Sequence, residues 1–368
     1  MTDRDDLEAW LRLLETPQLG RESARKLLAA FGSPQAVIAA STEARREVVP
    51  LHRTAALATA PALLESLVAS ALTWLDQATD EAPRAVIPLD DPRYPRALLD
   101  SADPPLLLYA QGRLELLQAD ALAIVGSRNP TPQGAENARA FAAHLSAAGL
   151  TIVSGLALGV DSAAHAGGLE GRASTIAVVG TGLDIVYPRR NLSLAHRIAA
   201  HGLMLSEYAL GTPSMAPNFP QRNRIIAGLA RGTLVVEAAL KSGSLITARL
   251  ANEAGREVFA IPGSIHSPQS RGCHALIKQG AKLVETAQDI LEDLRLPVVG
   301  GRGPAVAATV PPADPLFDAL GFDPVTLDAL AARTGHAAAE LSARLLELEL
   351  EGRVARLPGQ LFQRLDAG

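Results

Sequence analysis

Clusters of small polar and basic residues follow apolar segments in the middle of the chain. Gly126, Ser127 and Arg128 follow the segment 121–125, and Ser154 and Gly155 end the segment 150–154. A small-residue turn before a helix leaves backbone N–H groups free, and the helix dipole favours an anion there. An arginine adds a fork of donors that suits a phosphate group. These turns therefore predict two neighbouring phosphate-binding sites.

Three further clusters add cations and hydroxyl groups. Arg189, Arg190 and Asn191 follow a proline that holds the chain extended, with a solvated surface position as the alternative. The run Arg222, Asn223 and Arg224 precedes an apolar stretch and is expected to stand at a helix start. The last cluster, Ser242, Gly243 and Ser244, opens another predicted helix. All three clusters are expected near the same edge of a sheet.

The titratable residues nearby do not complete a catalytic set. Asp161 and His165 are four residues apart on a predicted helix, but no nucleophile accompanies them, so a structural pairing is favoured over acid/base chemistry. Glu237 ends a predicted strand and is expected to orient an arginine. The one cysteine, Cys273, excludes a disulfide framework and CxxC metal sites. The turns lack GxGxxG spacing, so neither a nicotinamide cofactor nor any other cofactor or metal is expected.

The distribution of charge marks the middle of the chain as the anion-binding region. The 368 residues have a net charge of −5. Residues 120–290 carry 15 Lys+Arg and 11 Asp+Glu, whereas residues 1–119 carry 12 and 17 and residues 291–368 carry 7 and 11. A basic centre therefore lies between acidic ends. The chain has neither a signal peptide nor an apolar run near the ~20 residues that span a bilayer, so a cytoplasmic protein without membrane contact is expected.

Strand and helix patterns alternate between residues 120 and 290, as in a doubly wound parallel sheet. The predicted strands are short and apolar on both sides, as strands covered on both faces must be. They are residues 121–126, 150–154, 174–180, 203–206, 233–237, 257–262 and 282–285. The run 106–109 follows an extended connecting segment and is expected to extend the sheet. Helices are predicted at 135–149 and 245–255.

The two ends of the chain follow other patterns. Helices predicted at 6–16, 22–33 and 57–77 include a hairpin that resembles a helix-hairpin-helix or SAM-like unit, with plain packing as the alternative. Three helices and a strand–turn–strand at 316–364 resemble a winged helix. The expected organisation is a helical domain at 1–82, a parallel-sheet domain at 83–295, a linker at 296–313 and a winged helix at 314–368.

The third helix of the predicted winged helix, 337–351, is acidic. It carries Glu340, Glu347, Glu349 and Glu351 against Arg344. Because this charge repels a DNA backbone, a protein contact is favoured over a weak auxiliary DNA site.

Seven ordered motifs resemble the DNA-processing protein A family, also called DprA or Smf. They are IVGSR at 124–128, IVSGLALGVDSAAH at 152–165, IAVVGTGLDIVYP at 176–188, FPQRNRIIAGL at 219–229, VVEAALKSGSLITA at 235–248, VFAIPG at 258–263 and GCHALIKQGA at 272–281. The resemblance covers residues 85–290 strongly and both ends loosely. It implies an α/β fold: an extended Rossmann-like parallel-sheet domain between a SAM-like or helix-hairpin-helix-like helical domain and a winged helix.

The resemblance also implies a function. Such a protein binds single-stranded DNA in natural transformation, protects incoming strands, helps to load the RecA recombinase and is not an enzyme. The implied partners are a second copy bound through the Rossmann-like domain, RecA and a single-strand-binding protein. Carried over by motif, the DNA site comprises the five clusters above, with Arg222 and Arg224 either contacting phosphate or bracing the pocket. Aromatic residues are only 4% of the chain and none lies at 189–194, so limited base stacking and salt-sensitive binding are expected.

Two other classes of function stay open at this point. One is a nucleotide phosphoribohydrolase on a related scaffold, because Glu237 stands near the Ser242–Ser244 turn, although the glycine-rich PGGxGT loop of that group is absent. The other is a regulator that reads duplex DNA through the winged helix, which the acidic third helix disfavours.

Overall fold

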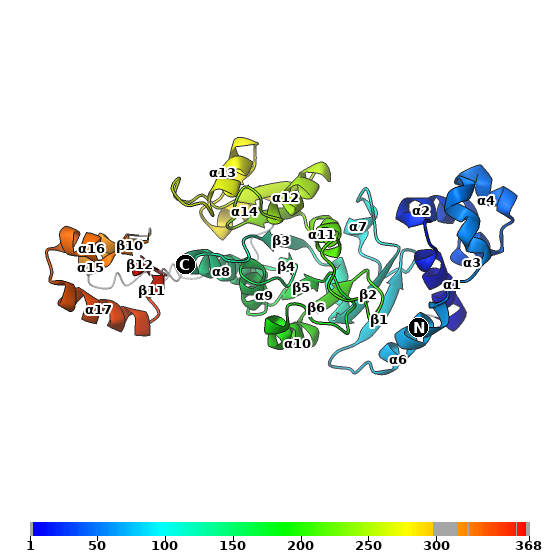
Figure 1. The fold of residues 1–368 in the computed structure, drawn as a ribbon, viewed down its shortest axis with the longest axis horizontal. Helices are drawn as coiled ribbons and strands as arrows, with labels where there is room; N and C mark the ends of the chain where they lie inside the picture. The colour runs from blue at the N-terminus through cyan, green and yellow to red at the C-terminus, as the bar shows by residue number, and fades with distance from the viewer. Residues whose placement is uncertain (1–2, 297–314, 322–323, 358, 366–368) are drawn as a thin grey trace.

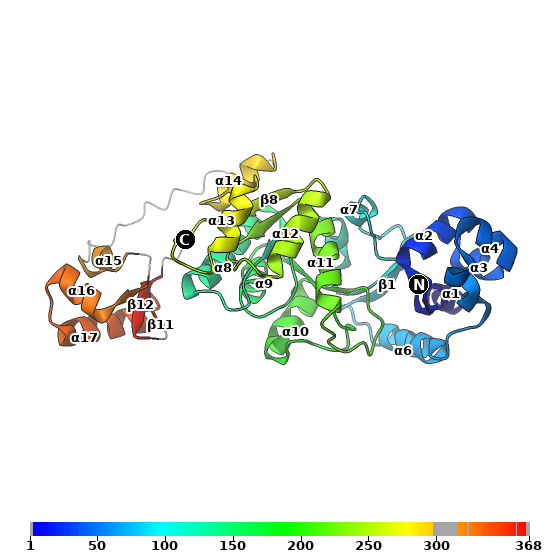
Figure 2. The same ribbon diagram turned by 45° about the horizontal axis from the view of Figure 1, so that its top comes forward.

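The computed structural model describes residues 3–296, 315–321, 324–357 and 359–365. The predicted linker at 296–313 lies outside the described residues, apart from residue 296. Figures 1 and 2 show the helical N-terminal region and the winged helix at opposite ends of a central sheet. We keep 1–82, 83–295 and 314–368 as proposed domains. No helix in the described part of the chain is both long and apolar enough to span a membrane.

The N-terminal region consists of short helices around a compact apolar core. They are α1 (Arg4–Glu15), α2 (Gly20–Phe31), α3 (Pro34–Ala39), α4 (Thr42–Val48), α5 (Leu51–Thr54), η1 (Ala55–Ala58) and α6 (Leu64–Asp76). Trp74 of α6 packs edge-on against Tyr109 of the central sheet, with ring centroids 6.0 Å apart, and so joins the two regions. The predicted helix at 57–77 is confirmed over residues 64–76 as α6, whereas the residues before Leu64 do not belong to it. Pro61 stands between η1 and α6, and a proline cannot donate the backbone hydrogen bond that a helix interior needs.

The central sheet has nine strands in the order β1-β2-β6-β5-β4-β3-β7-β8-β9. All seven predicted parallel strands are confirmed, with several shorter than predicted. They are β3 (Ala121–Val125), β4 (Thr151–Ser154), β5 (Thr175–Val178), β6 (Leu203–Ser206), β7 (Gly232–Val235), β8 (Glu257–Ala260) and β9 (Lys282–Leu283). The predicted extension at 106–109 is confirmed as β2 (Leu107–Gly112). It pairs antiparallel with β6 and with β1 (Arg84–Pro88), a strand within the segment predicted to be connecting chain.

Helices cover both faces of the parallel strands. Alternate side chains of β3 point to opposite faces: Leu122 and Ile124 enter one core, and Ala123 and Val125 the other. The first core is closed by α8 (Pro132–Ala148), α9 (Val160–Gly168) and α14 (Ala287–Asp293). The second is closed by α11 (Asn218–Leu229), α12 (Ser244–Glu253), α13 (Arg271–Lys278) and the short α7 (Arg96–Leu99). Helix α10 (Leu192–His201) covers the β5–β6 part of the sheet.

The C-terminal region has the elements of a winged helix. Its helices are α15 (Pro315–Leu320), α16 (Leu327–Thr334) and α17 (Ala338–Leu350). A small sheet in the order β10-β12-β11 joins β10 (Val325–Thr326), β11 (Val354–Leu357) and β12 (Leu361–Arg364). Leucines of all three helices and Phe362 of β12 form one apolar core. The predicted three helices and hairpin are therefore confirmed.

Candidate nucleic-acid interface

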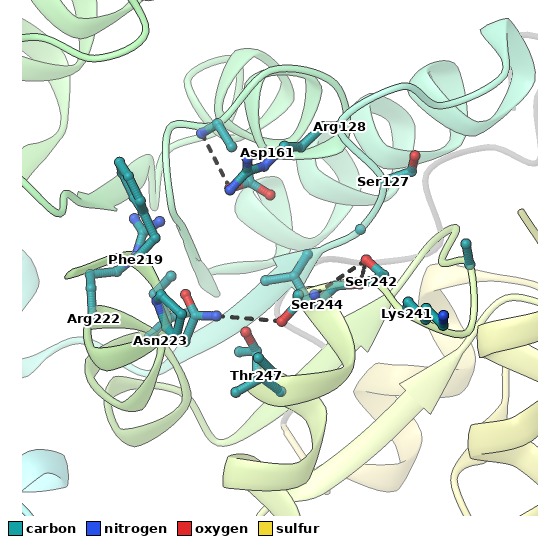
Figure 3. A pocket seen from close by; sticks show the side chains of 18 of the residues that line it. Ser127, Arg128, Asp161, Phe219, Arg222, Asn223, Lys241, Ser242, Ser244 and Thr247 are labelled. Carbon is teal, nitrogen blue, oxygen red and sulfur yellow. Dashed lines mark hydrogen bonds between the residues drawn. The ribbon is translucent and has the colours of Figure 1, made fainter. Parts of the chain in front are cut away.

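A cleft of about 850 Å³ lies at the carboxyl edge of the sheet, where β3 and β7 end. The chain passes from β3 to β4, β5 and β6 on one side and then returns to β7 on the other side of β3. Such a reversal of strand order opens a crevice beside the carboxyl ends, which is where α/β sheets bind ligands. Figure 3 shows Ser127 and Arg128 on one side of the hollow, Lys241 to Ser244 on another, and Phe219 to Asn223 on a third.

The turn after β3 supplies one wall of the cleft. Gly126, Ser127 and Arg128 line it as predicted, and the Ser127 hydroxyl accepts a hydrogen bond from the Asn129 N–H at 3.1 Å. The Arg128 side chain is exposed, and within the described residues it has no carboxylate or hydrogen-bond partner. Its charge is therefore available to an anion.

The turn before α12 supplies the opposite wall. Ser242, Gly243 and Ser244 line the cleft as predicted, and the Ser242 and Ser244 hydroxyls lie 2.7 Å apart. The first residues of α12 line the cleft, so the positive end of its dipole lies there. The Ser244 N–H donates to the Ser242 hydroxyl at 3.3 Å, and the N–H groups of the next two residues donate to backbone carbonyls of the same turn. Lys241 is exposed beside it without a partner in the described part of the chain. Arg128 and Lys241 thus give the cleft two exposed cations that are unpaired within the described residues.

An aromatic pair lies at the mouth of the cleft. Tyr187 and Phe219 line it with ring centroids 5.5 Å apart, and Tyr187 is 47% exposed. Both rings lie outside residues 189–194, the segment on which the expectation of limited stacking rested. Tyr187 stands two residues before Arg189, and Phe219 lies in a different motif. The cleft therefore offers a stacking surface as well as cations, contrary to the expectation of limited stacking.

Arg222 braces the cleft and does not present its charge to it. Its side chain is in the wall but only 4% exposed, and Nη1 donates to the Gly155 carbonyl at 2.7 Å and to the Val178 carbonyl. Burial lowers the pKa of Arg222 to about 10, while nearby Asp161 opposes that shift. A Cβ at residue 155 would lie 2.6 Å from the guanidinium, which explains the glycine there. Of the two roles expected for Arg222, phosphate contact or bracing, the structure places it in the bracing position.

Ser154 and Gly155 are also behind the surface. The Ser154 hydroxyl is buried and donates to the Ile124 carbonyl at 2.7 Å. The Gly155 N–H donates to Asp161 at 3.1 Å. Neither residue lines the cleft, because their polar groups are used up between adjacent strands and helices. The second predicted phosphate site, after β4, is thus filled by the protein's own carboxylate.

Asp161 and His165 have separate structural roles. Asp161 accepts hydrogen bonds from the N–H groups of Gly155 and Ala157, and burial raises the pKa of its carboxyl group. His165 accepts from the Leu156 N–H through Nε2, so Nδ1, 2.7 Å from Thr175 Oγ1, carries the proton. Burial, assisted by Arg222, lowers the pKa of His165 to about 3, which keeps the ring neutral. Both residues have structural roles, but the predicted pairing between them is wrong, because among the described residues each is hydrogen-bonded to other groups.

Arg224 points away from the cleft. Helix α11 begins at Asn218, so the predicted helix start at Arg222 is wrong and both arginines lie inside the helix. Residues two apart on a helix point about 200° apart, which sends Arg224 to the opposite side. There it pairs with Glu207 and with Asp103, at 2.9 Å. Asn223, between them, does line the cleft, and its amide donates weakly to the Gly243 carbonyl at 3.4 Å.

The cluster at 189–191 also separates into one buried residue that supports the cleft and two exposed residues. Asn191 is buried and donates through Nδ2 to the carbonyls of Leu156 and Ala157, so it braces the loop below the cleft. Arg189 and Arg190 are exposed next to Tyr187, outside the cleft lining and without a partner in the described residues. They extend the positive surface beyond the cleft.

Glu237 does not orient an arginine. Its carboxylate accepts hydrogen bonds from the N–H and hydroxyl of Thr131, at 2.9 and 2.6 Å, at the start of α8. Burial raises the pKa of this carboxyl group. Glu237 is absent from the cleft lining, so the acid that the hydrolase interpretation required is turned toward α8. Across the described residues, no three His, Cys, Asp or Glu side chains are arranged to hold a metal ion.

The fold and this cleft define a Rossmann-like α/β protein with a cleft at the carboxyl edge of its sheet, lined by exposed cations. The family model described as DNA recombination-mediator protein A matches residues 85–295, and the DprA winged helix domain matches residues 301–360. The chain belongs to this DNA-processing family, DprA/Smf, as the motifs predicted.

Similar proteins cover most of the chain. Protein Smf of Escherichia coli K12 is 43% identical over 301 residues, 79% of each chain. DNA processing protein DprA of Streptococcus pneumoniae is 50% identical over 205 residues, 56% of this chain and 72% of that one.

Two solved structures have the same fold. The X-ray structure of DprA from S. pneumoniae covers 78% of this chain and 97% of its own, with a TM-score of 0.67 and 38% identity. DprA from Helicobacter pylori, whose structure is described as showing a unique single-stranded DNA binding mode, covers 58% and 95%, with a TM-score of 0.53 and 33% identity.

Proposed function

We propose that this protein binds single-stranded DNA in the cleft between β3 and α12. One observation carries the proposal: Arg128 and Lys241 both line the cleft, are exposed and are unpaired within the described residues, with the start of α12 beside Lys241. Phosphates would bind these cations, helped by the positive end of the helix dipole, without regard to sequence. An unstacked base would lie against the exposed ring of Tyr187, which a base inside a duplex cannot reach.

The surroundings support a path for the strand beyond the cleft. Arg189 and Arg190 lie exposed beside Tyr187, so a strand leaving the aromatic end meets further positive charge. The buried residues Arg222 and Asn191 hold the loops that carry these contacts. We therefore propose that the exposed residues contact DNA directly and that the buried residues hold the loops in place.

The wider role is proposed from the family. We propose a cytoplasmic protein of natural transformation that protects incoming single strands and helps to load the RecA recombinase. A homodimer through the Rossmann-like region and a contact with single-strand-binding protein belong to the same proposal. The matching family is one of DNA recombination mediators, and two relatives are described as DNA processing proteins, which supports this role.

Fluorescence anisotropy of a labelled oligo-dT strand tests the central proposal. Titrations across a salt series should show binding that weakens linearly on logarithmic axes, because phosphate contacts release counterions. A duplex of the same length should bind much more weakly. Failure of the single strand to bind at low salt would remove the proposal.

We also propose that binding occurs without turnover. Glu237 is engaged with Thr131 and does not line the cleft, which leaves the hydrolase interpretation without its acid. Incubation with nucleoside monophosphates should release no free base. Release that disappears in Glu237→Gln would restore the hydrolase instead.

A further inference from the structure

Helix α17 has an outer face that the core of the winged helix does not use. The inner face packs into that core through Leu341, Leu345 and Leu348. Leu346 and Leu350, four residues apart on another side of the helix, are 56% and 81% exposed. Exposed Ala339 and Ala343 continue the same line, since residues three and four apart are neighbours on a helix. This apolar line is called the α17 stripe.

Carboxylates flank the α17 stripe. Glu340, Glu347 and Glu351 follow one another at helical spacing beside it, and Glu349 lies on its other side. Three of these carboxylates have partners among the described residues: Arg344 lies 2.6 Å from Glu347, His336 lies 3.3 Å from Glu340, and Arg353 lies 3.7 Å from Glu351. All three pairs are solvent-exposed, where an ion pair contributes little. Helix α17 has three glutamates and one arginine, a net charge of −2, and Glu351 brings the face to −3.

A groove adjoins the stripe. It has a volume of about 400 Å³, and Leu316 of α15 and Leu341 and Ala343 of α17 contribute to its lining. Glu340 and Glu347 line it as well, together with their partners His336 and Arg344, so apolar and charged groups alternate along one surface. Figures 1 and 2 show α17 on the winged helix, away from the strands that carry the cleft.

We propose that the α17 stripe and its groove dock a basic amphipathic helix of a partner protein. Leucine-type side chains of the partner, spaced at i and i+4, would pack on Leu346 and Leu350, as amphipathic helices do in apolar grooves. Lysines or arginines flanking those anchors would meet the glutamates on both sides, and such charge complementarity selects and steers a partner. The same carboxylates repel duplex DNA, which a winged helix would otherwise contact through this helix. The proposal is independent of the DNA cleft.

The test uses the full chain and a fluorescein-labelled peptide of about 18 residues, or five helical turns. The peptide places leucines along one face and lysines on both flanks. Anisotropy titrations should show binding that weakens with salt, while a scrambled peptide of the same composition should bind poorly. The double variant L346S/L350S should lower the affinity about tenfold at fixed salt, because the apolar anchors lose their partners. E340Q/E347Q should lower it severalfold and flatten the salt dependence.

Matched controls separate this surface from general attraction between a cationic peptide and an acidic protein. Leu63 in the helical region is 68% exposed, and Leu63→Ser should leave peptide affinity unchanged. Glu115 is 65% exposed and paired with a nearby arginine, as Glu347 is, so Glu115→Gln is the charge control. Oligo-dT binding and the thermal midpoint should be unchanged in all the variants, since the substituted residues are exposed and outside the cleft.

Several outcomes would overturn the proposal. Equal peptide affinity of L346S/L350S and the unaltered chain would show that the stripe is not the docking site. Loss of duplex binding in these variants would make α17 a DNA contact. A change in oligomeric state by light scattering would assign the face to a second copy of this chain.

Discussion

The guanidinium groups of Arg128 and Arg222 belong to walls of the same cleft, yet their surroundings are opposite. Arg128 is exposed and unpaired within the described residues, whereas Arg222 is buried against two carbonyls and near Asp161. A free cation can be neutralised by a ligand, whereas a cation already satisfied by the protein holds elements together. The comparison separates contact from support, although both residues are arginines beside one hollow.

The largest expected effect is the loss of stability on removing the buried arginine, Arg222. Arg222→Ala would leave Asp161 without its nearby positive charge and two carbonyls without a donor, and breaking such buried pairing destabilises by about 3–5 kcal/mol. Urea unfolding should show this loss, with Arg222→Lys intermediate because an ammonium keeps the charge without the guanidinium fork. Arg128→Ala is the control and should stay within about 0.5 kcal/mol of the unaltered chain. An equal loss of stability in Arg222→Ala and Arg128→Ala would show that the two arginines do not differ in structural role.

Removing the exposed cations Arg128 and Lys241 should have the opposite effect: DNA binding weakens and stability does not change. R128A/K241A should weaken oligo-dT binding by roughly two orders of magnitude, since each charge-assisted contact contributes about 1.5–3 kcal/mol. The slope of log K against log salt should fall by about 0.7 for each lost phosphate contact with a single strand. Unfolding should be unaffected. Lys278→Ala, an exposed lysine on α13 outside the cleft lining, is the matched control. Affinity and slope that match the control would place the strand elsewhere.

Tyr187 is expected to contact a DNA base by stacking, which salt does not screen, in contrast to the phosphate contacts of the two cations. Tyr187→Ala should lower oligo-dT affinity by about 1–3 kcal/mol through lost stacking, while Tyr187→Phe should retain it. Because stacking involves no phosphate, the salt slope should not change in either variant. Anisotropy with the same strand measures both quantities. A slope that falls in Tyr187→Ala would mean that the ring positions a cation instead of stacking.

The distinction between the two kinds of arginine could be predicted only in part. Strand ends and small-residue turns placed Gly126 to Arg128 and Ser242 to Ser244 correctly, because carboxyl ends of parallel strands share one edge. The run at 222–224 was predicted at a helix start because it precedes an apolar stretch, but α11 begins at Asn218 and Pro220 does not mark its boundary. Pro220 lies in the first turn of α11, where its missing N–H has no helical partner to lose.

The roles of side chains at strand ends could also be predicted only in part from the sequence. Ser127 and Ser154 both follow apolar strand residues, and nothing local distinguishes them. Ser154 is the last residue of β4 and donates across to β3, whereas Ser127 lies beyond β3 and is only half-buried. Tyr187 and Phe219 meet from separate motifs, so only the folded chain brings the two rings together. Burial and long-range pairing therefore decide roles that residue type and spacing leave open.

A smaller effect concerns the second paired arginine, Arg224, and the helical region that it holds. Asp103 receives Arg224 at 2.9 Å together with Arg21 and Arg25 of α2, at 2.8 and 2.5 Å. Burial alone would raise the pKa of Asp103, but these arginines prevail and lower it to about 2 from its ordinary value of 3.8. The folded state thus favours the ionised carboxylate. The resulting stability is present above about pH 4 and is lost as the pH falls toward 2.

Asp103→Asn should therefore lower the free energy of unfolding by about 1–2 kcal/mol at pH 7, after allowing for solvent screening of a side chain that is one-third exposed. The difference from the unaltered chain should shrink below pH 4, because both proteins then carry a neutral group at this position. Urea unfolding across pH measures it, with Asp80→Asn, an exposed residue, as the control. A difference that stays undiminished at pH 2 would mean that the three arginines need two acceptor oxygens at this position, one of which the asparagine NH2 replaces, and not the negative charge. The cluster would then resemble the packing role of Arg222 more than an ion pair.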